Sequence, residues 1–200
     1  MLGVLPEARL ALADAPVIAP MTFSLYTIGH SNHALEDFLA LLDAHAVRGI
    51  ADVRAFPSSH RWPHFNREPL AQALHAHSVA YEWIPKLGGR RHRPRPDSPH
   101  TAWTVEAFRN YADHTESAEF AEGLEQLLAA ASARTTAFMC AEALYWQCHR
   151  RLIADQFVVR GHGVRHIQNR ERTIEHRLPD FARVVDGRII YDGGTQLEML

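Results

Sequence analysis

The residues best suited to chemistry are concentrated in residues 138–155, FMCAEALYWQCHRRLIAD, which run from an apolar strand into a helical pattern. Cys140 and Glu142 are separated by one residue, and in an extended chain such side chains point to the same face. A thiolate and a carboxylate could therefore face one substrate or one metal ion, if a nearby cation lowers the thiol pKa. The simpler alternative is that Cys140 is a small buried residue.

Cys148, His149 and Arg150 follow in the expected helix, where steps of about 100° prevent all three from facing one ligand. Cys148 shares a row with Leu144 and Leu152, which predicts a core position. We assign His149 and Arg150 to anion binding. The alternatives are a packed histidine and an arginine that pairs with an internal carboxylate.

Polar residues also follow two earlier β-rich stretches. His30 follows YTIG and could act as a general base, because an imidazole titrates near pH 6.5, or complete a metal site. Arg54 comes two residues after Asp52, and it is either a phosphate clamp or half of a structural ion pair.

The segment 86–95, KLGGRRHRPR, is basic and contains a pair of glycines. Gly88 and Gly89 allow backbone amides to approach an anion, and Lys86 and Arg90 supply positive charge, so these four residues are predicted to bind phosphate. The alternative is a solvated loop whose arginines pair with the acidic stretch 113–125. The chain has neither a P-loop motif nor the glycine pattern of a dinucleotide site.

The elements that must position these residues alternate along the chain. Strands are predicted at 23–31, 49–57, 79–85, 134–142 and 163–168, and helices at 34–47, 67–78, 104–131 and 143–161. This alternation predicts an α/β fold, a mostly parallel sheet of about five strands with helices on both faces. Ligands bind such sheets at the carboxyl ends of the strands, where each polar cluster is expected to lie.

Length and composition limit the remaining choices. Two hundred residues suit one domain, which we place at 21–200 with a C-terminal hairpin near 183–193, preceded by a disordered extension at 1–20. Two cysteines favour reduced thiols in the cytoplasm, and no stretch has the about 20 apolar residues of a membrane span. A formal charge of -2 identifies no partner, and neither a cofactor nor an oligomeric state can be assigned.

Six motifs occur in an order that resembles a known family: YTIGHSN, DVRAFPSS, YEWIPKLGGR, FRNYAD, CAEALYWQCHRRLIAD and VRHI. Over about residues 24 to 168 the chain is similar to the domain-of-unknown-function family numbered 488. The resemblance implies an α/β domain of intracellular, mostly prokaryotic proteins and brings no established activity. The chain departs from the family pattern in its extra N-terminus and in the arginine-rich insertion 91–100.

Three functional hypotheses follow from these residues. The first is an enzyme acting on a phosphate-bearing substrate, either a nucleotide or a nucleic acid, with His30, Cys140 and Glu142 as catalytic residues. The second is a noncatalytic nucleotide or nucleic-acid binding module that relies on the basic segment. The third is a metal-binding protein, although the spacing of the cysteines and histidines matches no compact zinc motif, so no metal ligand is assigned.

Overall fold

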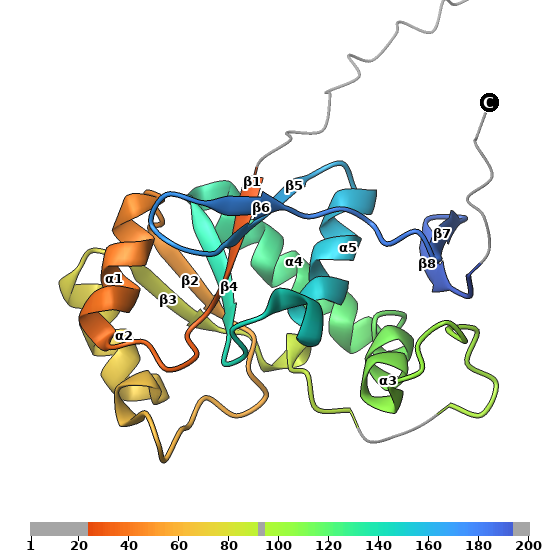
Figure 1. Ribbon diagram of the computed structural model, residues 1–200, viewed down its shortest axis with the longest axis horizontal. Coiled ribbons are helices and arrows are strands. Elements are labelled where there is room, and N and C mark those ends of the chain that lie inside the picture. The colour runs from red at the N-terminus through yellow and green to blue at the C-terminus, as the bar shows by residue number, and fades with distance from the viewer. Residues whose placement is uncertain (1–23, 92–94, 194–200) are drawn as a thin grey trace, which may run out of the picture.

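A computed structural model describes residues 24–91 and 95–193 of the chain (Figure 1). Its main feature is a six-stranded sheet in the order β3-β2-β4-β1-β5-β6, of which the first five strands are parallel. The strands are β1 (Ser24–Gly29), β2 (Gly49–Asp52), β3 (Ala80–Trp83), β4 (Thr136–Cys140), β5 (Gly163–Ile167) and β6 (Thr173–Glu175). The predicted single α/β domain with a mostly parallel sheet is therefore confirmed. The expected disordered extension at 1–20 lies outside the described residues.

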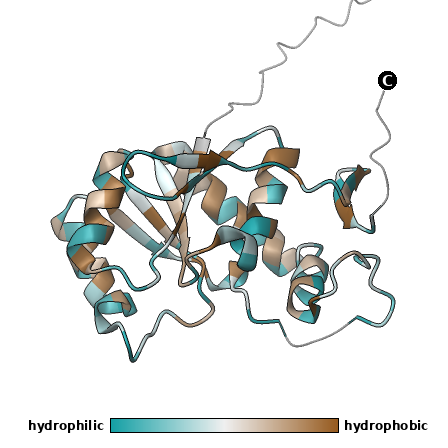
Figure 2. Ribbon diagram, in the orientation of Figure 1, coloured by the Kyte–Doolittle hydropathy of each residue, from teal (hydrophilic) through white to brown (hydrophobic). Residues whose placement is uncertain are grey.

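Helices cover both faces of this sheet because the crossovers from β1 to β2 and β2 to β3 move toward one edge, whereas those from β3 to β4 and β4 to β5 move toward the other. Figure 1 shows α1 and α2 on one side of the sheet and α4 and α5 on the other. The helices are α1 (Leu35–Ala44), α2 (Arg67–Ala76), α3 (Glu106–His114), α4 (Ala118–Ala133) and α5 (Arg150–Val159). Figure 2 shows hydrophobic residues concentrated on the sheet and its covering helices, whereas the loops are mostly hydrophilic.

Two hydrophobic clusters lie on the two faces of the sheet. Phe38 and Leu42 of α1 pack with Met139 of β4, whereas Phe157 of α5 packs with Phe138 on the opposite face. Successive β4 residues therefore alternate between the two clusters, as the period of two in a strand requires. Cys140 ends β4 on the Phe157 side.

Two elements follow the parallel core. β6 pairs antiparallel with β5 and is the last strand at that edge of the sheet. The strands β7 (Ala182–Val185) and β8 (Arg188–Tyr191) form a separate hairpin around Asp186 and Gly187, both of which have positive φ. Positive φ at both central residues is the backbone geometry of a two-residue hairpin turn. Among the described residues, no helix is both long enough and apolar enough to cross a lipid bilayer.

The predicted start of the helix at 143–161 was wrong. Tyr145–Gln147 form a short 3₁₀ turn, and α5 begins only at Arg150. The Arg150 guanidinium draws the preceding loop inward by donating to the Glu142 carbonyl at 2.5 Å and to the Ala143 carbonyl at 3.4 Å. Cys148 therefore leaves the predicted helical row and lies in the approach to the helix.

Candidate functional site

The carboxyl ends of β1, β2 and β4 meet at one edge of the sheet. Gly29 is level with Cys140 and Asp52 is level with Met139, so the residues that follow these strands open onto the same side. A cleft of about 1300 Å³ lies there, and His30, Arg54 and Cys140 all line it. The prediction that separate strands deliver polar groups to a shared mouth therefore matches the geometry.

A cluster of Cys140, Cys148 and His149, called here the CCH cluster, lines this cleft. Its two sulfur atoms and the imidazole nitrogen all lie within 4.8 Å of one another. Nδ1 of His149 is 3.6 Å from Cys148 Sγ and 3.9 Å from Cys140 Sγ. Both cysteines are buried and free rather than disulfide-bonded. Two thiols and one imidazole can act as nucleophile and proton acceptor, or as soft metal ligands.

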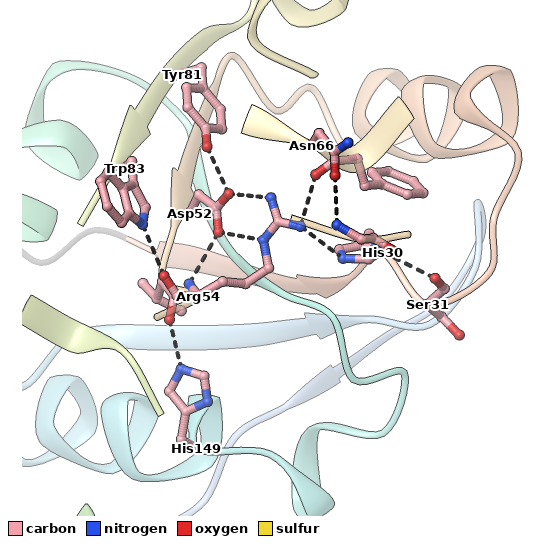
Figure 3. Close-up of polar contacts among 11 residues, drawn as sticks. His30, Ser31, Asp52, Arg54, Asn66, Tyr81, Trp83 and His149 are labelled. Atoms are coloured by element: carbon pink, nitrogen blue, oxygen red, sulfur yellow. Dashed lines mark hydrogen bonds and ion pairs between the residues drawn. The ribbon is translucent and has the colours of Figure 1, made fainter. Parts of the chain in front are cut away.

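The backbone of β2 sets the orientation of the His149 ring. Nε2 lies 2.9 Å from the carbonyl oxygen of Val53, so this nitrogen carries the proton and donates it (Figure 3). In the neutral imidazole Nδ1 is then the acceptor, facing the sulfur atoms. Gly89 makes room for this arrangement, because a β-carbon at position 89 would lie 2.4 Å from Nδ1.

Charge and hydrogen bonding distinguish the two thiols. Burial opposes ionisation of Cys148, but a hydrogen bond from the Cys140 thiol, the neighbouring His149 imidazole and the charge of Arg150 place the pKa of Cys148 well below its ordinary value. The same hydrogen bond, followed by burial, raises the pKa of Cys140 well above its ordinary value. Arg150 also donates from Nε to Cys148 Sγ at 3.4 Å. Cys148 is therefore the more acidic thiol, whereas Cys140 was the cysteine predicted to be catalytic.

A second polar group joins Arg54 to His30 and Asp52 beside the cleft (Figure 3). Arg54 donates to the Asp52 carboxylate from Nε at 2.8 Å and Nη2 at 2.5 Å, and from Nη1 to His30 Nε2 at 3.1 Å. His30 therefore carries its proton on Nδ1, which donates to the carbonyl of Ser31 at 3.1 Å. Burial, and then the positive charge of Arg54, lowers the pKa of His30 to about 4. A neutral His30 whose lone pair accepts from Arg54 is poorly placed to act as a general base.

A buried series of hydrogen bonds fixes the position of Arg150. Its Nη1 lies 3.3 Å from Thr27 Oγ1, which is 2.7 Å from His166 Nδ1. His166 Nε2 lies 2.9 Å from His176 Nδ1, and His176 Nε2 lies 2.7 Å from the Asp155 carboxylate. With both rings neutral, every proton in this series points from Arg150 toward Asp155. This series of hydrogen bonds orients Arg150 next to Cys148.

The structure separates the sequence-predicted residues into two groups. The first lines the cleft and consists of His30, Arg54, Gly89, Arg90, Cys140, Glu142 and His149. The second group, Lys86, Gly88 and Arg150, does not line it. Arg150 is buried with its donors directed at protein carbonyls, Thr27 and a sulfur, so the geometry favours a structural role over the predicted anion clamp.

Most of the basic segment contacts acidic residues instead of opening onto the cleft. Lys86 pairs with Glu122 at 2.5 Å, and Arg91 pairs with Glu119 at 3.2 Å. This is the alternative in which the loop cations neutralise the acidic stretch. Arg90 differs, because it lines the cleft with its guanidinium 5.7 Å from the centre of the Phe56 ring. Among the described residues of this segment, Arg90 is therefore the cation best placed to meet an incoming anion.

Sequence reasoning missed several residues of the site. Phe56, Arg61 and Trp62 line the cleft but were not among the predicted site residues. Phe56 lies in the motif DVRAFPSS, and the basic and aromatic character of Arg61 and Trp62 was the available signal. Cys148 was predicted to be a core residue, and it is buried in the core cluster as predicted, but it also lines the cleft. Its position directly before His149 and Arg150 was the available signal.

The comparisons with known proteins give one match. The family described as "Domain of unknown function DUF488" matches residues 34–157, which include Cys140, Cys148 and His149. No curated protein and no solved structure matches the chain.

Proposed function

Because the chain belongs to the DUF488 family, a domain of unknown function, we propose a function from the geometry of the cleft: an enzyme that acts on a phosphate-bearing substrate. The observation that carries the proposal is the CCH cluster, which places an acidic thiol, an imidazole and a second thiol in one open cleft. Reactive thiols in such surroundings are typical of nucleophilic catalysis.

Cys148 takes the role of nucleophile in this proposal. Its sulfur attacks an electrophilic centre of the substrate, the bond from that centre to the leaving group breaks, and water later releases the covalent adduct from the sulfur. Nδ1 of His149, 3.6 Å away, accepts the thiol proton. Cys140 donates a hydrogen bond to the Cys148 thiolate. Glu142 is exposed and lines the cleft, so its carboxylate can exchange protons with a leaving group or water. His30 supports Arg54 and is not part of the proton transfer.

The substrate class follows from the cations at the mouth and the size of the cleft. Arg90 and Arg61 line the cleft beside the aromatic rings of Phe56 and Trp62. Guanidinium groups bind phosphate, and exposed rings stack on bases. The cleft volume of about 1300 Å³ exceeds the roughly 300–1,000 Å³ of ordinary small-molecule pockets. We therefore favour a nucleotide or nucleic acid over a small phosphate ester, in a reducing cytoplasmic compartment that keeps both thiols free.

The test measures thiol reactivity and its protection by ligand. Iodoacetamide should alkylate Cys148 faster than Cys140, as followed by mass spectrometry of peptides. A mononucleotide or a short single-stranded oligonucleotide at low salt should slow that reaction, and Arg90→Ala should weaken the protection. Arg188→Ala, an exposed arginine on β8 and not one of the cleft-lining residues, is the matched control. The proposal would be refuted if the two thiols reacted at equal rates, or if none of the phosphate-bearing ligands slowed the alkylation.

A noncatalytic nucleic-acid binding module is the second candidate, and one observation favours it. Phe56 is 66% exposed and Val105 is 53% exposed, and both line the cleft. Exposed aromatic rings beside arginines are the usual platform for single-stranded nucleic acid. In this case oligonucleotide affinity should fall steeply with salt and survive Cys148→Ser, and no turnover should accompany binding.

A further inference from the structure

We propose that the CCH cluster is a binding site for one thiophilic divalent cation, with Zn²⁺ as the expected metal. Cys140, Cys148 and His149 supply two sulfurs and one nitrogen, a ligand set that zinc accepts readily. All three residues line the cleft, so the remaining coordination position faces it. Three protein ligands and an open position are typical of reactive zinc sites rather than structural ones.

The distances from the imidazole nitrogen to the two sulfur atoms fit tetrahedral zinc. Zinc–sulfur bonds of about 2.3 Å and zinc–nitrogen bonds of about 2.0–2.1 Å place sulfur and nitrogen ligands about 3.6 Å apart at a tetrahedral angle. The observed separations from His149 Nδ1 are 3.6 Å to Cys148 Sγ and 3.9 Å to Cys140 Sγ. The two sulfur atoms lie within 4.8 Å of each other, and tetrahedral zinc needs them about 3.8 Å apart, so side-chain adjustments of up to about 1 Å would complete the site.

The surroundings of the cluster prepare these atoms for a cation. The Val53 carbonyl accepts the Nε2 proton of His149 at 2.9 Å, which leaves the Nδ1 lone pair facing the thiols. Metal-binding histidines usually donate their other nitrogen to a carbonyl or carboxylate in this way. Two thiolates would neutralise the charge of Zn²⁺, and binding would release the thiol protons to solvent.

Gly89 supplies the space beside Nδ1. A β-carbon at position 89 would lie 2.4 Å from Nδ1 and 2.8 Å from Cγ of the same ring, which is too close for any atom. An alanine there would push the ring away and move Nδ1 from the two sulfurs. The glycine that was predicted to belong to an anion-binding loop therefore has a second role next to the cluster.

A bound cation would also control the chemistry proposed above. It would occupy lone pairs of both sulfurs, so Cys148 could not act as a free nucleophile while the metal is bound. This consequence rests on the proposed function. The metal site itself rests only on the geometry of the three ligands.

The experiment titrates the full-length, reduced, chelator-treated protein with Co²⁺ and follows sulfur-to-cobalt charge-transfer absorbance. We expect one equivalent to bind and Zn²⁺ to displace it. Cys148→Ser and His149→Ala should each weaken Zn²⁺ binding at least 100-fold, and Gly89→Ala should weaken it at least tenfold. His75→Ala, an exposed histidine of α2, is the matched control and should bind as the unaltered protein does.

Two results would overturn the proposed metal site. If the folded, reduced protein with native sequence binds no stoichiometric Co²⁺ or Zn²⁺, the proposal is wrong, and this holds even if a variant fails to fold. Zn²⁺ binding that is unchanged in both Cys148→Ser and His149→Ala, with native circular dichroism, would also overturn it.

Iodoacetamide separates this proposal from the proposed function. If Zn²⁺ binds and protects Cys148, while the metal-free protein shows an ordinary thiol with no ligand protection, the metal site stands and the thiol enzyme fails. If the protein binds no metal but Cys148 is reactive and protected by ligand, the thiol enzyme stands and the metal site fails.

Discussion

Asp52→Asn should be among the most damaging single substitutions near the cleft. The carboxylate is fully buried and accepts from Arg54 Nε at 2.8 Å, from Arg54 Nη2 at 2.5 Å and from the Tyr81 hydroxyl at 2.7 Å. Asparagine would replace one acceptor oxygen with an NH₂ group that faces donors. The guanidinium would also lose its counter-charge in a buried setting. Breaking a buried pair from one side costs about 3–5 kcal/mol of unfolding free energy.

Tyr81→Phe is the matched control for this prediction. It removes one hydrogen bond to the same carboxylate and leaves the ion pair with Arg54 intact, so the expected loss is about 1.5–3 kcal/mol. Urea unfolding followed by tryptophan fluorescence measures both variants, with the slope checked for two-state behaviour. If Asp52→Asn loses no more unfolding free energy than Tyr81→Phe, the ion pair does not hold this edge of the sheet.

Three further predictions concern the residues around the site. Gly29→Ala should lower the free energy of unfolding in urea by about 1–3 kcal/mol, because its β-carbon would overlap the Glu142 carbonyl. The same overlap should speed alkylation of the thiols. Unchanged stability would contradict the packing. The pKa of His30 is about 4 in the folded protein against 6.5 unfolded, so the unfolded chain binds more protons between these values. Stability should therefore fall by up to about 3 kcal/mol as pH drops from 6.5 to 4, and unfolding of His30→Gln should depend less on pH; an equal pH dependence would refute this. Tyr191→Phe should lose about 1.5–3 kcal/mol in the same urea assay, because the Asp155 carboxylate loses a donor at 2.7 Å, and an unaltered midpoint would oppose that interpretation.

The strand-to-helix alternation allowed the sheet and its functional edge to be predicted. Apolar runs such as TAFMC form buried strands, and in a parallel sheet every such strand ends on the same side. Placing His30, Arg54 and Cys140 at one cleft therefore required only local pattern and chain direction. The edge strand β6 was not predicted, because its three residues depend on pairing with β5 rather than on their own pattern.

The roles of individual residues were less accessible. Cys148 is buried in the core as predicted, but its place beside Cys140 and His149 was not predicted, because helical periodicity was extended through residues 143–149. Arg150 was assigned to anion binding from its charge. The buried guanidinium instead takes the Glu142 and Ala143 carbonyls and leaves the loop irregular. In these contacts a side chain competes with the helical backbone for carbonyl groups. The spacing of residues in the sequence does not show which of them forms the hydrogen bond.

The fold class and the edge of the sheet that carries the cleft followed from the sequence alone, and seven of the ten predicted site residues line that cleft. These properties depend on hydrophobic period and chain direction, which are local. Only the tertiary structure decided that Cys140, Cys148 and His149 converge and that Val53 and Gly89 orient the imidazole. It also decided that Arg150 points inward. Such contacts join different strands, loops and a helix, and their geometry exists only when the elements pack together.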